Sequence, residues 1–149
     1  ARPEVWHQAG RGLADARAPY AAAQVDARVV EFIDDMSEAY QWADLVIARA
    51  GALTVSEIAM VGVGSILVPF AAAIDDHQTL NARHLARGGA ARVISERELT
   101  PDVLARSLAD CLGAFDGLVA SAEAAHARAR HTVAERIAEA CVAAAEARR

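Results

Sequence analysis

Short apolar runs alternate with helical segments over residues 4–95, and this alternation constrains the fold more than any other feature of the sequence. The run ARVVEFI (27–33) is rich in β-branched residues, and the runs DLVIA (44–48) and SILVPF (65–70) are compact and apolar, as strands are. Continuously apolar strands are typical of a parallel sheet with both faces covered by helices. We therefore predict an α/β fold with a doubly wound, Rossmann-like parallel sheet.

The expected elements follow from the apolar runs and from the residues that begin and end helices. Strands are expected at 4–8, 27–33, 44–48, 65–70 and 91–95, and helices at 11–24, 35–43, 54–63 and 77–87. Thr100 and Pro101 are typical of the N-cap and first position of a helix. No strand pattern follows them, and helices are expected at 102–112, 115–130 and 133–149. We therefore expect a sheet domain over 1–113 and a C-terminal helical tail over 114–149.

Charge and cysteine content exclude several classes of protein. Fifteen basic and 20 acidic residues give a net charge of −5, whereas general nucleic-acid binding requires a basic face, so no nucleic-acid partner is expected. Cys111 and Cys141 lie far apart, outside the spacing of a disulfide framework or a zinc site. The longest uncharged run, 58–74, is shorter than the roughly 20 apolar residues of a membrane span.

The first candidate site is the segment 49–57, which follows the strand at 44–48. Gly51 permits a tight turn there, and Thr54 and Glu57 have the spacing of a capping box, which predicts a helix that begins at Thr54. The amide groups at such a helix start suit a diphosphate, and a carboxylate there can accept hydrogen bonds from ribose hydroxyls. The same spacing is equally typical of a helix cap that binds no ligand.

The second candidate site is the polar segment 75–81, after the strand at 65–70. Gln78 and Asn81 share a helix face near its N-terminus, where their amides can donate to and accept from sugar hydroxyls. Taken alone, the pattern favours a capped helix start beside a solvated loop. A metal site from Asp-Asp-His at 75–77 is only weakly indicated, because adjacent loop residues seldom converge on one ion.

The third candidate is the segment FIDDM (32–36), at the end of the second predicted strand. A backbone N–H and C=O at a strand end can pair with the edge of a planar base. The alternative is ordinary helix capping, with Asp34 or Asp35 as the N-cap.

Together these segments resemble the C-terminal half of one family, the MurG family of bacterial UDP-N-acetylglucosamine transferases. The resemblance covers about residues 3–110, and the helical tail more loosely. The run RAGALTVSE is highly specific to this family, whereas a lone glycine motif would be only weak evidence. The segments that carry it are VWHQAG (5–10), FIDDM (32–36), WADLVIARAGALTVSEIA (42–59), VPF (68–70), DDHQTLNA (75–82) and GGAARVI (88–94).

The resemblance implies the donor-binding, C-terminal domain of a GT-B glycosyltransferase of peptidoglycan synthesis. Such an enzyme transfers N-acetylglucosamine (GlcNAc) from UDP-GlcNAc to lipid I and forms lipid II, by inverting transfer to the muramoyl 4-hydroxyl. The resemblance implies no cofactor and no metal. It places the enzyme at the cytoplasmic face of the bacterial cell membrane as a peripheral protein, in cell-wall biogenesis, cell shape and cell division.

The resemblance also implies roles for individual residues. Ile33 would contact uracil through its backbone, Glu57 the ribose hydroxyls, and Gln78 the GlcNAc hydroxyls. Arg49 would either support the phosphates or form a structural ion pair. The implied donor-site residues are Ile33, Ala52, Leu53, Thr54, Val55, Ser56, Glu57 and Gln78, with Met36, Arg49, His77 and Asn81 in supporting positions. No residue of the chain matches a catalytic base.

The resemblance further implies that the chain is a fragment, inactive alone, which begins at the family's second strand. The first strand with its glycine-rich loop, and the N-terminal domain that binds lipid I and the membrane surface, would be missing. Loss of that strand would leave two unpaired sheet edges. Two alternatives stay open: a nucleotide-sugar-binding subunit or domain of another UDP-sugar transferase of GT-B fold, and a non-catalytic scaffold for cell-wall proteins.

Overall fold

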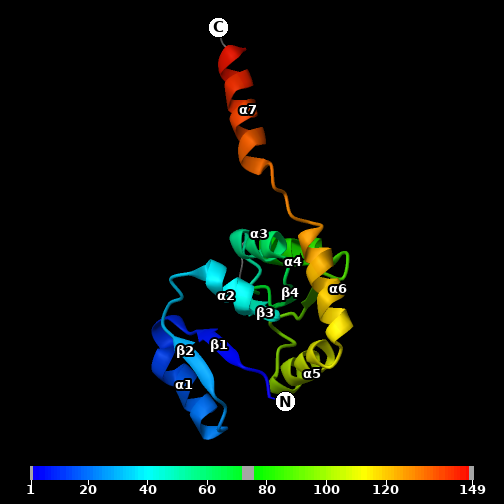
Figure 1. Cartoon of the computed structure of the whole chain (residues 1–149). Coiled ribbons are helices and arrows are strands. Elements are labelled where there is room, and N and C mark those ends of the chain that lie inside the picture. The colour runs from blue at the N-terminus through cyan, green and yellow to red at the C-terminus, as the bar shows by residue number, and fades with distance from the viewer. Residues whose placement is uncertain (1, 72–75, 148–149) are drawn as a thin grey trace. The chain divides into compact units, whose positions relative to one another are not determined.

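A computed structural model describes residues 2–71 and 76–147 of the chain (Figure 1). The chain divides into two compact units, residues 1–42 and 43–149. Every strand pairing within them is parallel, and strands alternate with helices up to β5. This confirms the predicted α/β class with parallel strands and a helical C-terminal region.

The first unit is one strand–helix–strand motif followed by a short helix. Val5 of β1 pairs with Ala27 of β2, and Gln8 with Val30, in a parallel two-stranded sheet. The Trp6 ring meets the edge of another tryptophan ring within the same unit, with the centroids 5.8 Å apart. Its elements are β1 (Val5–Gln8), η1 (Gly10–Gly12), α1 (Leu13–Ala22), β2 (Ala27–Val30) and α2 (Met36–Trp42).

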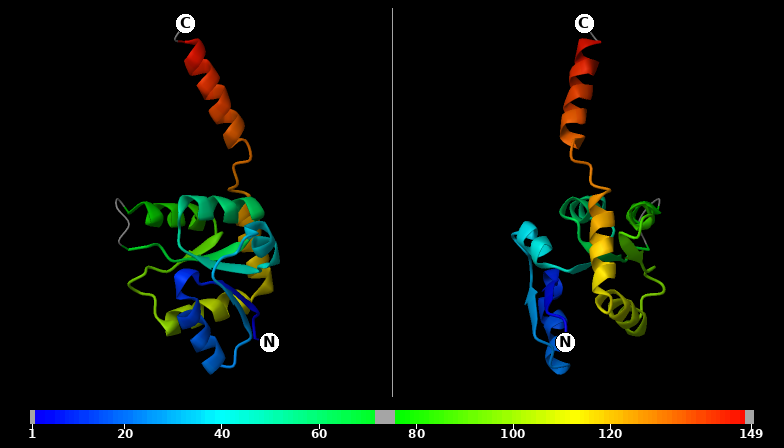
Figure 2. Two further views of the ribbon diagram at one scale, coloured as in Figure 1. Left: turned by 90° about the vertical axis from the view of Figure 1, so that its left-hand side faces the viewer. Right: turned by 45° about the vertical axis from the view of Figure 1, so that its right-hand side comes forward.

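The second unit is built on a three-stranded parallel sheet in the order β3-β4-β5. The central strand β4 is buried along its whole length, and α6 packs against both α3 and β4 (Figure 2). The largest fully buried side chains are Ile58, Ile66, Leu67 and Leu85. The elements are β3 (Leu45–Ala48), α3 (Ala52–Val61), β4 (Gly64–Leu67), α4 (His77–Ala86), β5 (Ala91–Val93), α5 (Pro101–Leu112), α6 (Phe115–His126) and α7 (Val133–Glu146).

The strand pairings of the described residues form two sheets instead of one continuous sheet. β1 pairs only with β2, and β3 pairs only with β4, so each of β1 and β3 has one unpaired edge in the described part of the chain. The strands are also shorter than the apolar runs, since β2 ends at Val30 and β4 at Leu67. Among the described residues, no helix combines the length and apolar character needed to cross a bilayer.

Thr100 caps α5, as the sequence predicts. Its hydroxyl accepts a hydrogen bond from the Val103 N–H at 3.2 Å, and Pro101 is the first residue of the helix. We expect Thr100→Ala to lower the free energy of unfolding by about 1 kcal/mol, because an amide of the first turn loses its acceptor. Urea unfolding followed by far-ultraviolet circular dichroism measures this change.

Thr132 offers a matched control, because it stands at the N-cap position of α7 without a side-chain capping bond. Thr132→Ala should change the free energy of unfolding by no more than about 0.5 kcal/mol, as surface substitutions do. Equal losses in the two variants would contradict the role given to the Thr100 hydroxyl.

Candidate functional site

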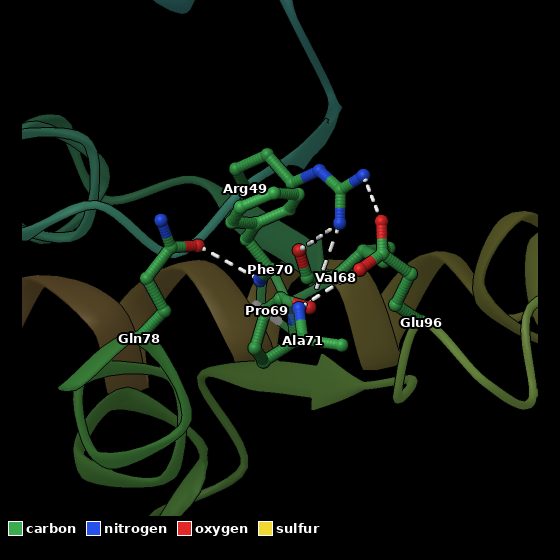
Figure 3. A network of polar contacts seen from close by, with 7 residues as sticks. All are labelled: Arg49, Val68, Pro69, Phe70, Ala71, Gln78 and Glu96. Carbon is green, nitrogen blue, oxygen red and sulfur yellow. Dashed lines mark hydrogen bonds and ion pairs between the residues drawn. The ribbon is translucent and has the colours of Figure 1, made fainter. Parts of the chain in front are cut away.

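The carboxyl ends of β3, β4 and β5 lie along one edge of the sheet, because the three strands are parallel. Ligands of open α/β sheets bind beyond this edge. The chain leaves it in three segments, 49–51, 68–71 and 94–100, and polar side chains from and around them form a network (Figure 3).

Arg49, the residue after β3, joins all three segments. Its Nη2 donates to Glu96 Oε1 at 2.5 Å. Its Nη1 makes longer contacts with the backbone oxygens of Val68 at 3.4 Å and Pro69 at 3.5 Å, and its guanidinium lies 5.4 Å from the centre of the Phe70 ring. Of the two roles expected for Arg49, the structure shows the structural ion pair; a contact with phosphates stays a prediction.

Glu96 has a second partner, the backbone of Ala71. Its Oε2 accepts a hydrogen bond from the Ala71 N–H at 2.8 Å. This bond, and then the hydrogen bond from Arg49, hold the pKa of the Glu96 carboxyl below its ordinary value. The carboxylate is therefore ionised at neutral pH, and its stabilising contacts are lost only as the pH falls through that lowered pKa.

Gln78, in the first turn of α4, binds the same segment from another side. Its Oε1 accepts a hydrogen bond from the Phe70 N–H at 2.9 Å. Because an N–H group needs an acceptor, this bond fixes which end of the amide is the oxygen. The end that is left to meet a ligand is Nε2, which can only donate.

Asn81, one turn further along α4, connects that helix to the segment before α3. Its Nδ2 donates to the backbone oxygen of Ala50 at 3.1 Å, and Ala50 is fully buried. In the structure Asn81 therefore binds and orients the backbone next to Gly51. A contact between Asn81 and a sugar stays a prediction.

The start of α3 differs from the prediction. The helix begins at Ala52, with Gly51 in extended conformation as its N-cap, and the Val55 N–H donates to the Gly51 oxygen at 3.0 Å. Thr54 is thus the third residue of the helix, and the predicted capping box of Thr54 and Glu57 is wrong. The extended Gly51 already turns the backbone into the helix, so no side-chain cap is formed there. The amides of residues 52–54 precede the first intrahelical bond and point out of the helix end.

The side chains of residues 52–57 differ in their exposure to solvent. Val55 is buried in the core at 7% exposure, so only its backbone is available to a ligand. Leu53 is 79% exposed, and Glu57 is exposed as well. The Ser56 hydroxyl donates to the backbone oxygen of Ala52 at 2.8 Å. Glu57 is therefore the one ionisable side chain that this segment offers to solvent.

The first unit holds the third candidate segment. The Ile33 N–H donates to Oε1 of Gln8 at 2.9 Å, and the Ile33 side chain is 8% exposed. Asp35 caps α2, since its Oδ1 accepts from the Glu38 N–H at 2.9 Å, and Met36 is the half-buried first residue of that helix. Because Gln8 occupies the Ile33 N–H, the Ile33 oxygen is the group that can meet a base edge.

The loop before α4 carried the weak metal-site prediction. His77 is the exposed first residue of α4, and Asp76 is its N-cap, while Asp75 lies outside the described residues. Within residues 2–71 and 76–147, no three histidine, cysteine or acidic side chains are grouped as metal ligands.

Gln8 and Glu96 are the two residues of these networks that the sequence pattern did not single out. Each bonds to a backbone group 25 positions away in the chain, and local spacing cannot reveal such a contact. One signal was available for Glu96, because it follows a strand of the sheet at the edge where ligands bind.

The comparisons with known proteins agree on one family. The model of the glycosyltransferase family 28 C-terminal domain matches residues 2–137. Two relatives, from Marinobacter nauticus and Nitrosococcus oceani, are each 50% identical over 97% and 95% of this chain. Both are named UDP-N-acetylglucosamine–N-acetylmuramyl-(pentapeptide) pyrophosphoryl-undecaprenol N-acetylglucosamine transferase. The chain spans 40% of the length of each of these relatives.

Solved structures give the same result for the fold. The crystal structure of Acinetobacter baumannii MurG is similar with a TM-score of 0.85 and 39% identity, over 91% of this chain and 42% of that one. The glycosyltransferase VinC, solved in complex with dTDP, is 21% identical over 84% of this chain and 37% of its own, with a TM-score of 0.59. The second likeness concerns the fold alone.

Proposed function

The chain belongs to the glycosyltransferase family 28 C-terminal domains, and from that membership we propose that it is the donor-binding half of a MurG-type transferase. The proposed reaction transfers GlcNAc from UDP-GlcNAc to lipid I, with inversion, at the muramoyl 4-hydroxyl. The observation that carries the proposal is the 50% identity, over nearly the whole chain, to relatives named for that transfer.

The start of α3 is the proposed site of the diphosphate. The amides of Ala52, Leu53 and Thr54 and the positive end of the helix dipole favour an anion there. The same groups would stabilise the charge that develops on the leaving diphosphate, in the manner of an oxyanion hole. Arg49 stands in a supporting position, and the exposed Glu57 carboxylate would accept hydrogen bonds from the ribose hydroxyls.

Gln78 is the proposed contact of the donor sugar. Its Nε2 amide would donate to a GlcNAc hydroxyl oxygen, while its oxygen holds the Phe70 N–H. His77 and Asn81, on the same helix, support this end of the site. In the first unit, the Ile33 oxygen would accept from the N3–H of uracil, with Met36 in a supporting position.

We assign binding of the acceptor to the part of the relatives' sequence that this chain does not cover. Lipid I, the general base and contact with the cytoplasmic face of the membrane would belong there. Residues 1–113 would recognise the donor, and residues 114–149 would form the helical region beside them. Alone, the chain is expected to bind UDP-GlcNAc without transferring it.

Calorimetric titration of the chain with UDP-GlcNAc, UDP and dTDP tests the proposed function. We expect binding of UDP-GlcNAc and UDP, with UDP-GlcNAc the tighter ligand, and weaker binding of dTDP. Preference for another UDP-sugar would favour a different transferase of the same fold. Failure of the folded chain to bind any of these nucleotides would contradict donor binding and favour the scaffold alternative.

Gln78→Glu tests the donor sugar contact with little change in shape. The carboxylate keeps an oxygen for the Phe70 N–H but loses the donating amide, so we expect UDP-GlcNAc to bind about tenfold more weakly. UDP lacks the sugar and should lose less affinity. An equal loss for both nucleotides would contradict a contact between Gln78 and the sugar.

A further inference from the structure

Glu96 holds two different parts of the second unit with its two carboxylate oxygens. Oε1 accepts from Arg49, just after β3, and Oε2 accepts from the Ala71 N–H, in the segment after β4 (Figure 3). Glu96 itself follows β5, so the carboxylate connects the ends of all three strands of the sheet.

Two successive amides of the segment 68–71 are bound by different side chains. The Phe70 N–H donates to Gln78 and the Ala71 N–H donates to Glu96. In Figure 3 the two side chains approach the segment from opposite sides. A rotation of the backbone that breaks one of these bonds therefore also disturbs the other.

Arg49 completes this arrangement on the carbonyl side of the same segment. Its guanidinium contacts the oxygens of Val68 and Pro69 while it is bound to Glu96. Glu96 must be an anion to accept from both the Arg49 guanidinium and the Ala71 amide. A glutamine in its place has one accepting oxygen and would turn a donating amide toward one of these two donors.

We propose that Glu96 is a positioning residue for the sugar end of the donor site. Through Ala71 and Arg49 it fixes the segment 68–71, and through Phe70 that segment fixes the Gln78 amide that meets the sugar. This inference rests on the proposed function, because it takes the GlcNAc moiety as the ligand of Gln78. Glu96 itself makes no contact with the substrate in this scheme.

Substitution of Glu96 is expected to weaken the binding of UDP-GlcNAc more than it lowers the stability of the fold. The Arg49 and Glu96 side chains are 49% and 30% exposed, and ion pairs with that exposure stabilise a fold only slightly. Loss of Glu96 should therefore leave the chain folded. It should release the Ala71 and Phe70 amides and leave the Gln78 side chain without a fixed orientation.

Glu96→Gln in the full chain is the test, with calorimetric titration of UDP-GlcNAc and of UDP. We expect UDP-GlcNAc to bind roughly five- to tenfold more weakly, by indirect loss of a hydrogen bond, while the affinity for UDP changes by less than about twofold. Asp110→Asn is the matched control, because Asp110 accepts from Arg92 at 2.8 Å in another exposed ion pair of the same unit. The control should bind both nucleotides as the wild type does.

Two further measurements separate positioning from a general structural role. Amide hydrogen exchange at Ala71 should be faster in Glu96→Ala, which removes both accepting oxygens, than in Asp110→Ala. The double variant with Gln78→Glu should bind UDP-GlcNAc no more weakly than Gln78→Glu alone, because both changes act on one contact.

The outcomes distinguish this inference from the proposed function. If the wild type binds UDP-GlcNAc and Glu96→Gln keeps the wild-type ratio of the two affinities, the positioning role is overturned and donor binding stands. If the wild type binds no UDP-GlcNAc, the proposed function fails and the role of Glu96 in sugar binding fails with it. If the Ala71 amide nevertheless exchanges faster in the Glu96 variant, the role of Glu96 is limited to ordering the segment 68–71.

Discussion

Glu57→Ala is expected to weaken the binding of UDP-GlcNAc by ~1.5–3 kcal/mol, roughly tenfold to more than a hundredfold. The exposed Glu57 carboxylate lies in the second turn of α3, close to the helix end proposed for the diphosphate. Hydrogen bonds from ribose hydroxyls to a charged acceptor are worth about this much when they are lost. Because UDP carries the same ribose, the loss should be equal for UDP and UDP-GlcNAc in calorimetric titrations.

An equal loss of affinity for UDP and UDP-GlcNAc distinguishes Glu57 from the residues at the sugar end of the donor site. Gln78→Glu and Glu96→Gln should act mainly on UDP-GlcNAc, whereas Glu57→Ala should act on both nucleotides. Glu139→Ala, in the exposed helix α7, is a control that removes the same charge elsewhere and should leave both affinities unchanged. Wild-type affinity in Glu57→Ala would show that the ribose is bound by another group.

Ile66→Ala is expected to lower the free energy of unfolding by ~3–5 kcal/mol, the largest effect on stability that we predict. Ile66 is fully buried in β4, the central strand, with β3 on one side and β5 on the other. Truncation removes buried methyl groups and leaves a cavity that the two neighbouring strands cannot fill. Urea unfolding followed by far-ultraviolet circular dichroism measures the loss.

Ile47→Ala is the matched control for that experiment. Ile47 pairs with Ile66 across the ladder between β3 and β4, but its side chain is 47% exposed. We expect its truncation to cost about 1 kcal/mol, because nearly half of the surface of Ile47 is already in contact with water. If the two variants lost equal free energies of unfolding, the conclusion that the core of this unit lies on β4 would be contradicted.

The order of strands and helices could be predicted because it depends on local patterns. The run SILVPF is apolar at every position after Ser65, and β4 is buried at every position, as the central strand of a covered parallel sheet must be. The cap of α5 could be predicted for the same reason, since Thr100 binds an amide only three residues away.

The start of α3 and the network at the sheet edge needed the structure. Thr54 and Glu57 have capping-box spacing, yet the extended backbone of Gly51 begins the helix earlier, and spacing alone cannot tell these two starts apart. The contacts of Arg49 with Glu96 and of Gln8 with Ile33 join residues 47 and 25 positions apart. Such pairs depend on which strands are neighbours, and that follows from the packing of the whole sheet.

All the tryptophan and tyrosine residues of the chain (Trp6, Tyr20, Tyr40 and Trp42) belong to the first unit. Near-ultraviolet absorbance and intrinsic fluorescence therefore come almost entirely from the unit that carries Ile33. The second unit, with α3, α4 and the segment 68–71, contributes only phenylalanine to these spectra. Emission from the natural indoles thus reports events around β1 and α2, and a tryptophan in place of Phe70 would report, as a second and separate signal, on the segment that Gln78 and Glu96 hold.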